Sequence, residues 1–176
     1  MKKVLWIALW GILFPGMLSA KGTPSVEVVI NASFEKVTEV KPRQLILSSA
    51  QHKQIQQQAK APVRTKIYRY YTIHSGDRTI GHGVLITRKV RTKKATVLYA
   101  FDQQGTLKFT EIMVFREPPE YIPNQAWMNQ FDNAETSALL TMGKDIPTIS
   151  GATLSARTIS DGARIARAIY QIVLKE

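Results

Sequence analysis

The sequence predicts an α+β domain, in which an antiparallel sheet of about four or more strands is packed with helices. Two observations lead to this fold class. Segments rich in β-branched and aromatic residues follow one another between residues 65 and 115, joined by short turn sequences. Helical patterns lie before and after this block, and the last is a long amphipathic segment that begins at Thr153. Strands grouped in this way favour an antiparallel sheet covered by helices over a parallel βαβ arrangement.

Three parts are expected along the chain: a signal peptide at residues 1–20, an N-terminal extension with a helix at residues 21–62, and a main domain at residues 63–176. Within the extension, residues 26–30 are mostly β-branched, which favours a strand or an extended lead-in. Residues 50–60 are rich in helix formers, with Ser48 or Ser49 as N-cap and Pro62 beyond the end. They predict a polar surface helix.

Four strands are expected in a meander. They are residues 65–73, 80–87, 95–101 and 106–115. Ser75-Gly76-Asp77 turns the first strand into the second, and residues 102–105, which end on a glycine, join the third to the fourth.

The remainder of the chain is expected to contain two connections and two helices. Three prolines within residues 116–123 exclude a helix there and predict a loop. Asn124 can cap a short helix over residues 125–131, and residues 132–145 form a second connection. Residues 153–174 show apolar positions at helical spacing and predict one long helix with a single apolar stripe.

The composition limits the possible chemistry. With 176 residues, 44% of them hydrophobic, the chain has the length and the apolar content of one globular domain. It contains no cysteine, which excludes disulfides, thiolate metal sites, iron–sulfur clusters and a cysteine nucleophile. Redox chemistry would therefore need a cofactor held by other means. The net charge of +11 admits nucleic acid, anionic membranes, acidic proteins or phosphorylated ligands as partners, and charge alone does not choose among them.

The first 20 residues resemble a bacterial secretory signal. Lys2 and Lys3 precede an apolar run at residues 4–14, and residues 18–20 provide the cleavage site. An uncleaved N-terminal anchor is the alternative. We therefore expect export to the periplasm or to the outer face of the cytoplasmic membrane, which argues against nucleic acid as a partner. Cleavage would remove two of the 24 basic residues and no acidic one, so the net charge would change from +11 to +9.

Small and hydroxyl residues gather where the last helix begins. The free N–H groups of a first helical turn and the positive end of the helix dipole favour an anion, and Gly151 and Ala152 would let a ligand approach the backbone. A phosphate would suit this position. On spacing alone, the favoured interpretation is the simpler one, in which Ser150 is an N-cap, Gly151 a turn residue and Thr153 a first-turn residue with a solvated hydroxyl.

A resemblance to a known family changes this weighing. Ser150-Gly151-Ala152-Thr153 matches the Ser/Thr-Gly-Ala-Thr signature of the FMN-binding domain family, found in subunits of the sodium-translocating NADH:quinone reductase and Rnf complexes and in nitrous-oxide-reductase regulators. In that family the last threonine carries FMN through a phosphoester, which a magnesium-dependent flavin transferase installs after export. The resemblance implies that Thr153 is the attachment residue and that a flavin transferase is a partner.

The resemblance covers roughly residues 64–174 in order. The further similar segments are Gly81–Val84, Phe101–Leu107, Glu111–Glu117, Trp127–Phe131 and Gly143–Ile146. It implies a cofactor site composed of Thr153, Ser150, Gly151, Ala152, Asp145, Lys144, Leu154, Glu117 and Trp127. No catalytic or metal-binding residue is expected.

The expected function is that of an exported flavoprotein electron carrier, rather than an enzyme with its own substrate. Covalent FMN on Thr153 would pass electrons between a membrane or periplasmic donor and an acceptor. The redox partner would be an acidic or a membrane-bound protein. The alternative is a non-redox, basic docking or assembly module on a degenerate flavin domain. A third hypothesis is a flavin-dependent reductase that acts directly on a small molecule.

Positive charge is concentrated in residues 60–94, which contain ten basic residues and one acidic residue, Asp77. We expect a basic hairpin tip at residues 89–94. This tip is either a solvated edge or a docking surface for an acidic partner or for membrane headgroups, where attraction speeds encounter and weakens with salt.

Overall fold

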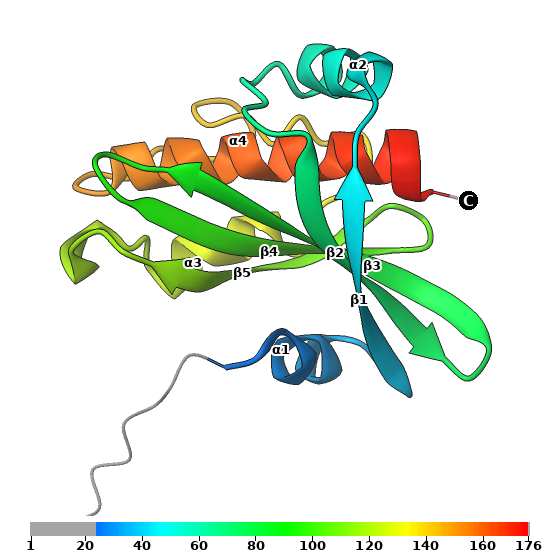
Figure 1. Ribbon diagram of the computed structural model, residues 1–176. Helices are drawn as coiled ribbons and strands as arrows, with labels where there is room; N and C mark the ends of the chain where they lie inside the picture. The colour runs from blue at the N-terminus through cyan, green and yellow to red at the C-terminus, as the bar shows by residue number, and fades with distance from the viewer. Residues whose placement is uncertain (1–23, 176) are drawn as a thin grey trace, which may run out of the picture.

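The computed structural model describes residues 24–175 and shows an α+β fold, which confirms the predicted class. The expected signal at residues 1–20 lies outside the described residues. Five antiparallel strands form one sheet, and their spatial order is their chain order (Figure 1). They are β1 (Glu39–Ile46), β2 (Ile67–Ser75), β3 (Arg78–Lys89), β4 (Lys94–Asp102) and β5 (Leu107–Phe115).

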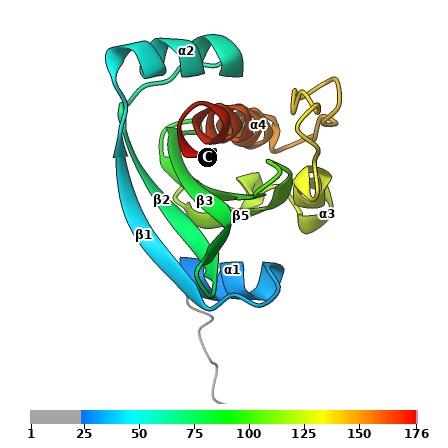
Figure 2. The ribbon, with the colours of Figure 1, turned by 90° about the vertical axis from the view of Figure 1, so that its right-hand side faces the viewer.

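Helices cover both faces of this sheet. They are α1 (Val26–Ser33), α2 (Ser49–Ala59), α3 (Gln125–Met128) and α4 (Thr153–Ile169). The long helix α4 lies in the concave side of the curved sheet with α2 above it, whereas α1 lies on the opposite face (Figure 2). Two hydrophobic clusters correspond to these two faces. Within residues 24–175, no helix is long and apolar enough to cross a bilayer.

Close packing joins α4 to the centre of the sheet. Ile159, Ala163 and Ala166 are buried along the helix, and the hydroxyl of the buried Tyr99 on β4 donates a hydrogen bond to the Ile159 carbonyl at 2.8 Å. Gly162 allows this contact, because a Cβ at that position would come within 3.0 Å of Tyr99 Cζ. The position of α4 along the sheet is therefore fixed by a polar contact as well as by apolar packing.

Most predicted elements are confirmed. Ser48 caps α2 through a capping box with Gln51, and the β2–β3 and β4–β5 turns contain Gly76 and Gly105 with positive φ. Asn124 caps α3, which continues as a 3₁₀ turn, Asn129–Phe131. The last helix begins as predicted, is α-helical to Ile169, and ends in a π-helical turn, Tyr170–Leu174. The proline-rich segment is a loop with one 3₁₀ turn, Pro119–Tyr121.

The predicted strand or extended lead-in at residues 26–30 is wrong, because this segment forms α1. Ser25 caps the helix by accepting the Val28 N–H at 3.4 Å. Val26 and Ile30, one turn apart, are both buried in the cluster on the outer sheet face. The chance to bury these side chains outweighs the strand preference of valine and isoleucine, which amounts to about 1 kcal/mol or less.

The strand β1 was not predicted, although it pairs with β2 along its whole length. It contains Pro42, and proline is tolerated in a sheet at an edge such as this one. Together with α2, whose Ile55 and Ala59 are buried in the main cluster, β1 brings the expected N-terminal extension into the sheet and the core.

We expect Gly162→Ala to destabilise the fold, although alanine is the better helix former by about 1 kcal/mol. The new methyl group would crowd the Tyr99 ring, and overpacking of this kind costs about 1–3 kcal/mol. Urea denaturation measures the change in the free energy of unfolding. Combining Gly162→Ala with Tyr99→Phe removes the hydroxyl from the crowded contact, so the two effects should be less than additive. A Gly162→Ala protein more stable than wild type would contradict the described packing.

Candidate functional site at the start of α4

The start of α4 is open, because no side chain of the described residues caps it. The N-cap is Ala152, so the interpretation of Ser150 as the N-cap is wrong. Gly151 has φ +79°, and a Cβ there would meet nothing within 4 Å. The left-handed glycine turns the chain sharply into the helix. The N–H groups of residues 153–155 in the first turn have no intrahelical acceptors.

Thr153 presents its side chain at this open helix end. It is exposed and lines a pocket of about 300 Å³ with Gly151, Ala152 and Leu154. Its hydroxyl donates a hydrogen bond to the Ile149 carbonyl at 2.9 Å. This bond takes up the hydroxyl proton and sets the side-chain rotamer, so that the oxygen has a defined position at the rim of the pocket.

Two residues from distant segments complete the pocket. Arg91 lies in the turn between β3 and β4, and Tyr121 lies in the 3₁₀ turn after β5. The Arg91 guanidinium is 4.6 Å from the centroid of the Tyr121 ring, a cation–π contact of about 0.5–1 kcal/mol. A permanent cation is thereby positioned next to a helix N-terminus, and both features favour a phosphate.

Neither residue belongs to the site that the sequence predicts. The sequence places Arg91 in the expected basic tip and Tyr121 in the proline-rich loop. Ser155, which is buried in the first turn of α4, is the third pocket residue that the predicted site does not include. No local pattern shows that the β3–β4 turn reaches the start of α4, because this proximity depends on the register of the whole sheet.

Glu117 does not line the pocket but holds the turn that carries Arg91. Its carboxylate accepts the backbone N–H groups of Arg91 at 2.9 Å, Thr92 at 2.6 Å and Lys93 at 2.7 Å. The Thr92 hydroxyl adds a fourth contact at 3.3 Å. These bonds, above all the one from the Lys93 N–H, lower the pKa of Glu117. Glu117 is therefore a positioning residue for Arg91.

Trp127 forms a hydrogen bond to the loop that precedes α4. Its ring is buried against Phe131, with the ring centroids 5.4 Å apart, and its indole Nε1–H donates to the Pro147 carbonyl at 2.8 Å. This bond ties the chain three residues before Ser150 to α3. Trp127 does not line the pocket at Thr153.

Asp145 and Lys144 lie in the turn further upstream. The Asp145 carboxylate accepts the backbone N–H groups of Leu140 at 2.5 Å and Thr141 at 2.8 Å. Burial acts to raise the pKa of Asp145, but these backbone donors outweigh it, so that the pKa lies below its ordinary value. Lys144 is exposed. Neither side chain lines the pocket at Thr153, and the role of Asp145 in the structure is to close this turn.

The structure thus brings part of the predicted site together. Gly151, Ala152, Thr153 and Leu154 share one pocket, and Ser150 is exposed next to it in the chain. Glu117, Trp127 and Asp145 bind the backbone of loops around the pocket, whereas Lys144 is exposed outside it. No protein-family model matches the chain, and a search of the curated proteins found no match for it. Membership of the FMN-binding domain family stays a prediction from the resemblance.

We expect Glu117→Gln to loosen the β3–β4 turn at neutral pH. In the wild type, the stabilisation by the carboxylate is present above the ordinary glutamate pKa and is lost as the pH falls through the lowered pKa of Glu117. The amide chemical shifts of Arg91, Thr92 and Lys93, followed by NMR against pH, should titrate with a midpoint below that of an exposed glutamate.

This titration should vanish in Glu117→Gln. The matched control is Glu120→Gln, which removes one negative charge from the neighbouring turn and should leave the titration of the three amides unchanged. A midpoint at or above the ordinary glutamate value, or an equal effect of both substitutions, would show that Glu117 does not hold the turn.

Proposed function

We propose that this protein is an exported electron carrier that holds FMN through a phosphoester to Thr153. The observation that supports it most is the position of Thr153, whose exposed hydroxyl lies at an uncapped helix N-terminus beside Arg91. The phosphate of FMN bound to Thr153 would therefore lie at the positive end of the helix dipole, where a negative charge is favoured. The proposed partners are a flavin transferase and a redox protein that is acidic or membrane-bound. The proposed location is the periplasm or the outer face of the cytoplasmic membrane.

The residues around Thr153 suit a phosphate group. The backbone N–H groups of residues 153–155 and the guanidinium of Arg91 are donors, and the space next to Gly151 is open. A negative charge at a helix N-terminus gains about 0.3–1 kcal/mol from the dipole. Arg91 would add charge-assisted hydrogen bonds. The covalent bond would keep FMN on the protein even though these interaction energies are small.

The attachment reaction requires an activated flavin. Thr153 Oγ1 would form the bond to phosphorus, while the phosphoanhydride of a flavin dinucleotide breaks and a nucleoside monophosphate leaves. The hydroxyl proton, held by Ile149 in the free protein, would pass to a base of the transferase. Because Thr153 is exposed on an open pocket, the transferase can reach it.

The role of the protein's own residues is to hold and present the cofactor. When bound, FMN supplies the acceptance and donation of electrons, which suits a chain without cysteine. Leu154, 45% exposed, and the ring of Tyr121 offer apolar surface beside the attachment point. The shallow pocket would leave a tethered group accessible to another protein, as transfer between carriers requires.

The attachment is tested by coexpression with a flavin transferase, followed by a denaturing gel and intact-mass measurement. Wild type should show flavin fluorescence on the denatured band and the added mass of one FMN less one water. Thr153→Ala should lose both, and Thr153→Ser should retain some label because it keeps the hydroxyl. The matched control is Thr148→Ala, which removes an exposed hydroxyl from the same loop and should be labelled like wild type.

The redox role is tested on the labelled protein. Its visible spectrum should bleach on chemical reduction and return on reoxidation. An unlabelled wild-type band in the presence of an active transferase would overturn the covalent attachment. A colourless protein whose partner binding survives Thr153→Ala would instead favour the non-redox docking module.

Arg91 should assist flavin attachment. We expect Arg91→Gln to slow labelling of Thr153 by about two- to fivefold, since one exposed charge interaction contributes up to about 1 kcal/mol. The control is Lys93→Gln, which makes the same charge change in the same turn at a residue that does not line the pocket. Time courses of in-gel fluorescence measure both. Equal slowing by the two substitutions would indicate a general charge effect rather than a contact of Arg91.

A further inference from the structure

A second cavity adjoins the pocket at Thr153. It has a volume of about 730 Å³ and lies where the loop after α2, the end of β3 and the start of β4 meet the middle of α4. Both cavities are lined by Arg91. We call the second cavity the basic groove, because five cationic side chains line it: Arg64, Arg88, Lys89, Arg91 and Lys94.

The floor of the basic groove is apolar. Tyr68, Ile86 and Ile165 line it and are each less than 10% exposed. Burial raises the pKa of Tyr68 to about 12, so its hydroxyl remains neutral and can donate a hydrogen bond. The groove therefore combines a recessed apolar surface with a polar donor, a pattern that is typical of ligand and peptide sites.

One of the five cations is a structural part of the groove wall. Arg88 donates to the Pro62 carbonyl at 2.9 Å and forms an ion pair with Asp161 on α4 at 3.2 Å. Asp161 also binds Arg164 at 2.6 Å, so its charge is shared between two guanidinium groups. These bonds connect the loop after α2, β3 and α4, and they hold the two sides of the groove together.

The other four cations have no carboxylate partner within 4 Å among residues 24–175. Arg64 and Lys94 are exposed and come from two segments far apart in the chain. Like charges crowded around one concavity repel one another, and they focus a positive potential into it. An anionic group in the basic groove would relieve this repulsion.

We propose that the basic groove binds an extended acidic segment of a partner protein. In an extended chain, successive side chains point to opposite sides, so carboxylates can reach the cationic rims while an apolar side chain between them contacts the floor. The recessed floor distinguishes the groove from a flat basic surface of the kind that lipid headgroups contact. The inference does not require the flavin, but the shared Arg91 means that a bound partner would lie next to Thr153.

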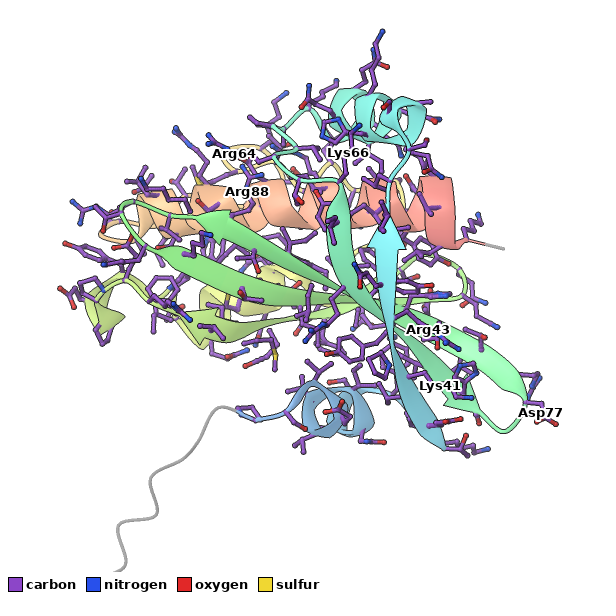
Figure 3. The ribbon with its side chains drawn as sticks, viewed as in Figure 1. Lys41, Arg43, Arg64, Lys66, Asp77 and Arg88 are labelled. Atoms are coloured by element: carbon purple, nitrogen blue, oxygen red, sulfur yellow. The ribbon has the colours of Figure 1, made fainter. Side chains whose placement is uncertain are left out.

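Cationic residues that line the basic groove lie far from the cationic residues on β1, so the two sets can be substituted separately. Figure 3 shows Arg64 and Arg88 together beside α4, whereas Lys41 and Arg43 lie on β1 toward the other end of the molecule. Arg43 is exposed and Lys41 is partly exposed. The pair on β1 therefore provides a matched control, because substituting it changes the net charge equally at a distance from the groove.

The probe is a fluorescein-labelled decapeptide of alternating Glu and Ser with one central Phe, and binding is measured by fluorescence anisotropy. We expect a Kd below about 1 mM that weakens as salt rises. A peptide with Gln in place of Glu should lose binding, and one with Ser in place of Phe should bind more weakly. Each titration is run with wild type and with Thr153→Ala, which should behave alike because the groove does not include Thr153.

The variants locate the binding surface. Arg64→Gln combined with Lys94→Gln should weaken peptide binding by about tenfold, mainly through slower association. Lys41→Gln combined with Arg43→Gln should change it by less than about twofold. Arg64 and Lys94 are exposed and lack ion pairs among the described residues, and the ion pair of Lys41 with Glu39 is a surface pair that contributes little to stability. Circular dichroism should therefore show both double variants folded.

Three results would overturn the proposal. The first is an equal loss of binding in both double variants, which would indicate a general charge effect. The second is equal binding of the Glu and the Gln peptides, or no binding of either. The third is groove-dependent binding of phosphatidylglycerol vesicles without binding of the acidic peptide, which would assign the groove to a membrane surface instead.

Discussion

The packing of α4 against the sheet is the constraint on which the other features depend. The bond from Tyr99 to the Ile159 carbonyl fixes the middle of the helix, and Tyr170 fixes its end by stacking on Phe101 and donating to the Gln103 carbonyl at 2.9 Å. With these contacts in place, the first turn of α4 lies beside the β3–β4 turn, and its open end faces the pocket that Thr153 shares with Arg91. The same helix contributes Ile165 to the floor of the basic groove. A shift of α4 by one turn, about 5 Å, would displace both cavities together.

Side chains that bind the backbone arrange the loops around the open end of α4. Glu117 gathers three N–H groups of the β3–β4 turn, Asp145 closes the turn before the helix, and Trp127 holds the Pro147 carbonyl. Such bonds specify the conformation of short connections that have little apolar surface of their own to bury. They also explain how residues outside a pocket can matter to it. A substitution at Glu117 would act through the position of Arg91 rather than through a ligand contact.

Local sequence patterns were sufficient to predict the hairpins, the caps at Ser48 and Asn124, and the start of the last helix. They failed for α1, where burial on the outer sheet face decides the conformation. They also missed β1, because Pro42 argues against a strand unless that strand lies at the edge of the sheet. Of the candidate site, the residues contiguous with Thr153 could be predicted. Arg91 and Tyr121 could not, because their proximity is a product of sheet register and loop path. A contact between two loops leaves no periodic pattern in the sequence.

The edge strand β1 also bears on how copies of the protein behave toward one another. An open sheet edge invites a second copy to pair with it and so to start an aggregate. Here Pro42 has no N–H to contribute, and antiparallel pairing centred on it would set Lys41 of each copy opposite Arg43 of the other. Like charges directly opposite each other destabilise such a pair. The sequence of β1 thereby protects its own edge from self-association and favours solubility at high protein concentration.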